Sequence, residues 1–164
     1  METPALSELD VPAREPYHHA PFSEACFEHA CGWRPRAGDT LILTAPKTGT
    51  TLLQQACHQL RVAAVTESEP EDDPANVGEF DDIYQVAPWL EMAFDLGQDL
   101  TTHEATTLAG AAAGAPPLAP RIFKTHSRLG AAPRAPGARS ICVLRAPVAT
   151  APPWLEFIGG TGAR

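Results

Sequence analysis

The sequence lacks a long apolar run, and its N-terminus shows no basic stretch followed by an apolar core. Neither a membrane-spanning helix nor a secretory signal peptide is therefore predicted, and we expect a cytoplasmic protein with no membrane partner. The four cysteines form no CxxC pair, which is typical of a reducing compartment. Cys26, His29 and Cys31 lie close together in the chain, but a second ligand pair at zinc-site spacing is missing, so we expect no metal.

Positive charge is also scarce, since 12 Lys and Arg stand against 20 Asp and Glu for a net charge of −8. This balance argues against nucleic acid as a partner. No lysine or arginine occurs between Arg61 and Arg121, and the acidic run TESEPEDDPANVGEFDD in that interval predicts a solvated loop. From Arg121 to Arg145 the sign reverses, because six basic residues occur there and no acidic one. Such a local positive field favours the capture of a small anion.

The length of 164 residues predicts one domain, and the 17 prolines predict irregular stretches within it. We expect an irregular N-terminal segment over residues 1–32 and the domain over residues 33–164. Trp89, Leu90, Met92 and Phe94 are assigned mainly to core packing, with a place in a ligand pocket as the alternative.

The hydrophobic pattern predicts alternating strands and helices. TLILTA at residues 40–45 is a short apolar run typical of a buried strand, and from Thr50 apolar residues recur at helical spacing. We further predict short helices from Pro88 to about Asp95 and within TTHEATTLAGAAAG, and buried strands at RIFKTH and SICVLR. This alternation indicates an α/β fold with a parallel sheet, in which ligands collect outside the carboxyl ends of the strands.

Residues Lys47 to Thr51 lie between the first strand and its helix, where backbone N–H groups converge and favour phosphate or sulfate. Gly49 permits close approach of the backbone, Lys47 supplies charge, and threonine hydroxyls can donate further hydrogen bonds. The lysine precedes the glycine, unlike the order in GxxxxGK[ST], so ATP hydrolysis is not predicted. From this stretch alone, an ordinary capped turn remains an alternative.

The segments APKTGTTLLQQ, FKTH and ICVLRAP occur in an order that resembles the sulfotransferase family, whose loop is typically TYPKSGTTW. RPRAGDTLILTAPKTGTTLLQQACHQLR, DDIYQVAPWLEMAFDLG and RIFKTHSRLG look like successive blocks of that family, so the resemblance spans about Trp33 to Gly160. It implies a fold related to the P-loop-containing nucleoside triphosphate hydrolases, with a parallel sheet flanked by helices. It also implies sulfuryl transfer from 3′-phosphoadenylyl sulfate (PAPS) to an alcohol, phenol or amine of a small molecule, without a metal.

The resemblance also implies roles for individual residues. His126 matches the catalytic base, while Lys124 matches a lysine near the transferred group and Arg145 an arginine that contacts the 3′-phosphate. Lys47 would stabilise charge on the leaving oxygen, and Leu52 stands where a tryptophan often stacks on adenine. The loop that holds the 5′-phosphosulfate corresponds to Lys47, Thr48, Gly49, Thr50 and Thr51.

The sequence departs from the family pattern in four places. Ala45 replaces the loop tyrosine, and Pro153 stands where a serine is expected to bind the 3′-phosphate. Losing that hydrogen bond costs about 1.5–3 kcal/mol. The prolines of APPWLEF are expected to break the helix that follows the last strand. Because the family continues with further helices, we expect a C-terminally truncated domain with an incomplete clamp for the 3′-phosphate.

Two alternatives remain open. One is a catalytically impaired sulfotransferase-like domain that binds a phosphorylated ligand or a protein. The other is a small-molecule kinase of the P-loop group, which the reversed order of glycine and lysine disfavours. The sequence does not specify the acceptor or the oligomeric state.

Overall fold

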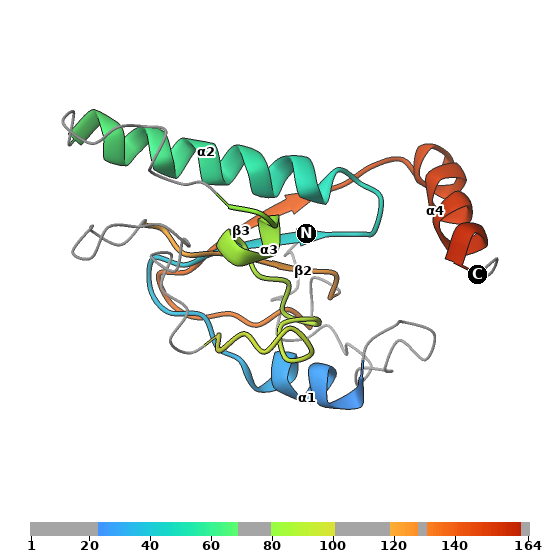
Figure 1. The fold of residues 1–164 in the computed structure, drawn as a ribbon, viewed down its shortest axis with the longest axis horizontal. Coiled ribbons are helices and arrows are strands. Elements are labelled where there is room, and N and C mark those ends of the chain that lie inside the picture. Colours follow the sequence, from blue (N-terminus) through green and yellow to red (C-terminus); the bar gives the residue numbers. More distant parts are fainter. Residues whose placement is uncertain (1–22, 69–79, 101–118, 128–130, 162–164) are drawn as a thin grey trace, which may run out of the picture.

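The computed structural model describes residues 23–68, 80–100, 119–127 and 131–161 (Figure 1). Three strands and four helices follow one another in the order α1 (Glu24–Gly32), β1 (Thr40–Thr44), α2 (Thr50–Ser68), α3 (Ile83–Val86), β2 (Ile122–Thr125), β3 (Arg139–Val143) and α4 (Pro147–Thr161). The predicted first strand and the helix after it are confirmed, as are strands at RIFKTH and SICVLR.

The three strands form a parallel sheet in the order β2-β1-β3. Thr40 pairs with Ile122 on one side and with Arg139 on the other, so all three strands enter the sheet at one level. Their carboxyl ends therefore meet at one edge, where Thr44 of β1 lies beside Val143 of β3. The predicted parallel α/β sheet flanked by helices is confirmed.

Helix α2 lies along one face of the sheet and α1 lies on the other (Figure 1). Side chains alternate between these faces along each strand. Ile42 and Ile122 pack with Leu53 and other residues on the α2 side. Trp33 packs on Phe123 with ring centroids 4.6 Å apart, in the core cluster that includes Ala30 of α1, Leu41, Leu43 and Leu90. Both faces of the central strand are therefore covered.

Helix α1 corrects the expectation of an irregular segment over residues 1–32, of which residues 1–22 lie outside the described part of the chain. The hydroxyl of Ser23 accepts a hydrogen bond from the backbone N–H of Cys26 and caps the helix. Cys26 and Ala30, four residues apart, are both buried. The cap and this spacing were the sequence signals for the helix.

The short helix expected after Pro88 is also corrected. Helix α3 precedes that proline and is capped by Asp82, whereas residues 90–97 form turns. The reason is that residues 88–90 run beside β2: the Lys124 N–H donates to Pro88 O at 2.8 Å, and the Leu90 N–H donates to Lys124 O at 2.9 Å. Backbone groups committed to the sheet are not available to a helix.

Two further expectations fail near the C-terminal end. Strand β3 was predicted to be buried, but its side chains are half-buried or exposed because α2 packs on β1 and β2. Helix α4 continues through Pro152 and Pro153, where a break was expected. It begins at Pro147, whose fixed φ suits a first helical position. Pro152 and Pro153 therefore come after the first helical turn and not within it.

The helix predicted within TTHEATTLAGAAAG lies outside the described residues, as does most of the acidic run, although its first three residues close α2. Within the residues that the structure describes, no helix is long and apolar enough to cross a membrane.

Candidate functional site

The loop from β1 to α2 is held closed by its own hydroxyl groups. The Oγ1 atoms of Thr44 and Thr50 lie 2.6 Å apart, and the hydroxyl of Thr48 donates to Ala45 O at 2.6 Å. Lys47 and Gly49 both adopt positive φ, at 61° and 98°. Two of the loop threonines thus shape the loop instead of reaching into solvent, and Thr51 is the exposed one.

The start of α2 provides the features of an anion site. The first amides of a helix have no partner within the helix, and the helix dipole is positive at that end. A side chain at Gly49 would meet nothing within 4 Å, so the space beside this glycine is open. Lys47 is exposed at the same loop. Backbone donors, a cation and open space therefore coincide where the sequence predicts the phosphosulfate.

His126 lies next to this loop, immediately after β2. Its Nδ1 atom is 2.6 Å from the carbonyl oxygen of Thr44, and its ring meets the edge of Trp89 with centroids 4.9 Å apart. Because a carbonyl only accepts, Nδ1 carries the proton and Nε2 is the basic nitrogen. Burial lowers the pKa of His126 below its ordinary value, with a smaller lowering from Lys124, while the Thr44 hydrogen bond and the charge of Glu91 oppose this.

Lys124 precedes His126 by two residues and is only 3% exposed. Its Nζ atom lies 3.8 Å from the ring centroid of Trp89 and 4.9 Å from that of Tyr84, and 3.4 Å from the Tyr84 hydroxyl. Burial lowers the pKa of Lys124 to about 8, although the charges of Glu91 and Asp82 oppose this. The ammonium is thus held between aromatic faces, which attract a cation.

Arg145 follows β3 and reaches the same loop. Its Nη1 donates to the carbonyl oxygen of Lys47 at 3.1 Å, across 98 residues of sequence. The Nζ atom of Lys47 lies 5.1 Å from the ring centroid of Phe157 in α4. Lys47, His126 and Arg145 each follow a different strand. The hydrogen bonds from His126 to Thr44 and from Arg145 to Lys47 therefore bring all three residues to the same loop.

Residues 37–158, most of the chain, match the Sulfotransferase domain family. This chain belongs to the sulfotransferase family. The match confirms the predicted relation to the P-loop fold and places the chain among transferases that move a sulfuryl group. A search of curated proteins finds no match to this sulfotransferase.

Sequence reasoning did not find the residues that surround the sulfotransferase's KTH segment. Tyr84 and Trp89 contact Lys124, and Glu91 accepts hydrogen bonds from Thr125 and Ser127. Of the four residues assigned mainly to the core, Leu90 is buried there, whereas Trp89 lies at the site and Phe94 is half-exposed. The sequence signal for Glu91 was its place two residues after a tryptophan, in a segment that has no basic residue.

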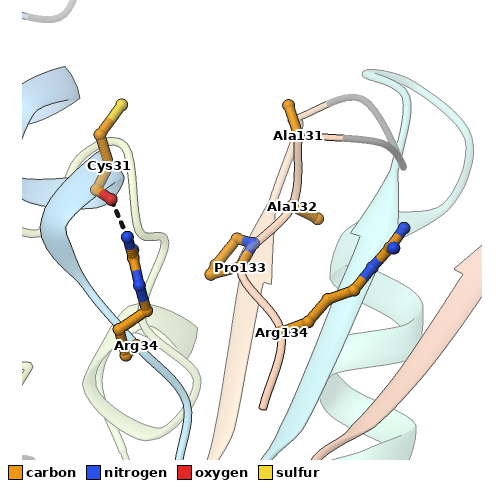
Figure 2. A pocket seen from close by; sticks show the side chains of 6 residues that line it. All are labelled: Cys31, Arg34, Ala131, Ala132, Pro133 and Arg134. Atoms are coloured by element: carbon orange, nitrogen blue, oxygen red, sulfur yellow. Dashed lines mark hydrogen bonds between the residues drawn. The ribbon is translucent and has the colours of Figure 1, made fainter. Parts of the chain in front are cut away.

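A pocket elsewhere in the sulfotransferase contains none of the predicted site residues (Figure 2). It lies between the end of α1 and residues 131–134, and Arg34 and Arg134 both line it. The guanidinium of Arg34 is committed to the carbonyl oxygens of Cys31 and Trp33, at 2.7 and 2.8 Å. In the described ranges, no three His, Cys, Asp or Glu side chains form a group able to hold a metal ion.

Proposed function

We propose that this chain transfers a sulfuryl group from PAPS to a hydroxyl or amine of a small-molecule acceptor. The observation that supports it most is the hydrogen bond from His126 to the carbonyl of Thr44. This bond connects a histidine of lowered pKa to the strand that precedes the anion-binding loop. A general base and an oxyanion site at adjacent strand ends are what this reaction needs.

The residues present suit the donor. The loop offers the amides at the start of α2 and the exposed Lys47 to the phosphosulfate, and open space beside Gly49 admits a group close to the backbone. Leu52 follows Thr51 in the first turn of α2 and is 76% exposed, so it offers an apolar surface to the adenine base of the donor. Arg145 supplies a guanidinium for the 3′-phosphate.

PAPS supplies an activated sulfuryl group whose leaving oxygen belongs to a phosphate. Neutral His126 takes the proton of the acceptor at Nε2 while Thr44 holds Nδ1–H in place. The ammonium of Lys124 balances negative charge on the sulfuryl oxygens, and Lys47 balances charge on the leaving oxygen. Each of these groups belongs to a strand end or to the loop after β1, and this common location supports the proposed roles.

The decisive experiment compares two labels. Radiolabelled PAPS and ATP labelled in the terminal phosphate are offered with a panel of phenols, alcohols and amines. Transfer of labelled sulfate supports the proposal, and transfer of labelled phosphate would instead support a kinase. If neither label moves while 3′-phosphoadenosine 5′-phosphate binds by calorimetry, the chain is a ligand-binding domain of the family.

A further inference from the structure

Two hydroxyl groups flank His126 and donate to a single carboxylate oxygen. The hydroxyl of Thr125 donates to Oε1 of Glu91, and the hydroxyl of Ser127 donates to the same atom at 3.0 Å. The backbone N–H of Ser127 also donates to Thr125 Oγ1 at 2.9 Å. The residues on both sides of the histidine are therefore fastened to one side chain.

Glu91 is itself firmly placed. It is 5% exposed and follows the segment that pairs with β2 through the backbone of Lys124. Since side chains alternate along β2, Thr125 points to the face opposite Lys124. The ring of His126 is thus fixed from two directions, by Thr44 through its Nδ1 atom and by Glu91 through its neighbours.

The second oxygen of the Glu91 carboxylate does not take part in these hydrogen bonds. Oε2 of Glu91 is buried, and among the described residues it has no hydrogen-bond partner. In the same part of the chain no lysine or arginine forms an ion pair with Glu91. A buried carboxylate in this position costs stability, which suggests that its charge serves the site.

We propose that Glu91 is a positioning residue for sulfuryl transfer: it orients His126 through Thr125 and Ser127, and its charge balances the ammonium of Lys124. This inference rests on the proposed function. It assigns two separable tasks to one side chain, since the hydroxyls need only an acceptor oxygen whereas Lys124 needs a negative charge.

The charge of Glu91 acts on both titrating groups in one direction. It raises the pKa of Lys124 and the pKa of His126, against the effect of burial on each. The other charged or titratable groups around them are Asp82 and Tyr84 beside Lys124, and Lys47 in the adjoining loop. Removing the Glu91 charge therefore lowers both pKa values.

Glu91→Gln isolates the charge, because the amide oxygen can still accept from both hydroxyls. Activity needs neutral His126 and charged Lys124, so both limbs of the pH–rate profile should move to lower pH in this variant. Thr125→Val isolates the positioning, because it keeps the charge and removes one donor. There we expect kcat to fall roughly ten- to hundred-fold, with KM for the donor little changed and both limbs in place.

The test also follows the C–H resonances of His126 by NMR as pH is varied, with His126→Asn to assign them. Glu28→Gln, which removes an exposed carboxylate of α1, is the matched control and should change neither the profile nor the titration. In Glu91→Gln the His126 titration should move to lower pH. An unchanged titration in that variant, or an unchanged kcat in Thr125→Val, would overturn the inference.

Failure of the proposed function gives a different result. If the wild-type chain transfers no sulfate, the NMR titration still reports whether Glu91 controls the charge of His126. Circular dichroism and thermal unfolding establish that each variant is folded. If Glu91→Gln does not fold, the positioning test in Thr125→Val still decides the inference. If Thr125→Val does not fold, Ser127→Ala takes its place, and a kcat equal to wild type in that variant would overturn the inference.

Discussion

The Nδ1 atom of His126 lies 2.6 Å from the carbonyl oxygen of Thr44, although 82 residues separate the two in sequence. This contact joins the end of β2 to the end of β1, three residues before Lys47. In neutral His126 it selects the tautomer with a basic Nε2, and it orients the ring from the same strand that leads into the anion loop.

Replacing His126 by asparagine should separate its two tasks. The asparagine amide can still donate to Thr44 O but cannot act as a base, so we expect kcat to fall by about 10²–10⁴-fold. Affinity for 3′-phosphoadenosine 5′-phosphate, measured by calorimetry, should stay within a factor of a few. His29→Asn in α1 serves as the control and should retain activity; a large loss of nucleotide affinity in His126→Asn would contradict this role.

The pH dependence of kcat/KM should be bell-shaped. His126 must be neutral, and burial lowers its pKa, so activity is retained below the ordinary histidine value of 6.5. Lys124 must be charged, so the rate should fall as pH rises through about 8. Initial rates measured from pH 5 to pH 10 check both limbs. A rate that stays constant up to the alkaline end would show that the charge on Lys124 is not needed.

Lys124→Met should gain stability and lose activity. The pKa of Lys124 falls from 10.5 to about 8 on folding, so its charged form is disfavoured in the folded state. That penalty is fully present below pH 8 and is relieved as pH rises toward 10.5. We expect about 1–3 kcal/mol greater stability at pH 7, measured by urea denaturation, and a smaller gain at alkaline pH. Lys47→Met, at an exposed position, should lose activity without this gain.

Gly49→Ala should strain the anion loop. The φ of 98° lies in the region that L residues rarely adopt, although the added methyl would meet no atom within 4 Å. We expect a loss of about 1–2 kcal/mol in stability and weaker binding of the nucleotide. Gly159→Ala in α4 is the control, because alanine in a helix interior stabilises by roughly 0.5–1 kcal/mol. Thermal unfolding and calorimetry of both variants give the comparison.

Asp39→Ala should destabilise the opposite end of the sheet. The Asp39 carboxylate accepts from Nε and Nη2 of Arg121 at 2.8 and 2.6 Å and from the backbone N–H of Arg36 at 2.7 Å. The Asp39 side chain is 4% exposed, and the variant removes the carboxylate that pairs with the mostly buried guanidinium of Arg121, at a cost of about 3–5 kcal/mol. Exposed Asp81→Ala should change stability by less than about 0.5 kcal/mol. Equal stabilities for the two variants would contradict the prediction.

Sequence patterns predicted correctly the elements that depend on neighbouring residues alone. A β-branched run followed by helical spacing predicts β1, the loop and α2, because each signal needs only neighbouring residues. Expectations failed where distant segments intervene. Residues 88–90 pair with β2 and so do not form a helix. Strand β3 is exposed because α2 packs on β1 and β2. Helix α4 completes its first turn before it reaches Pro152, because it begins at Pro147.

The order of motifs along the chain determines the family, the sheet direction and the candidate loop, since hydrophobic period and the Lys-Thr-Gly-Thr-Thr run are properties of adjacent residues. Folding in three dimensions decides the protonation of the site. The tautomer of His126, the burial of Lys124 between Trp89 and Tyr84, and the attachment of Glu91 to Thr125 all depend on segments that are distant in sequence. A pKa depends on which charges and how much water surround a group, and only the packed chain sets both.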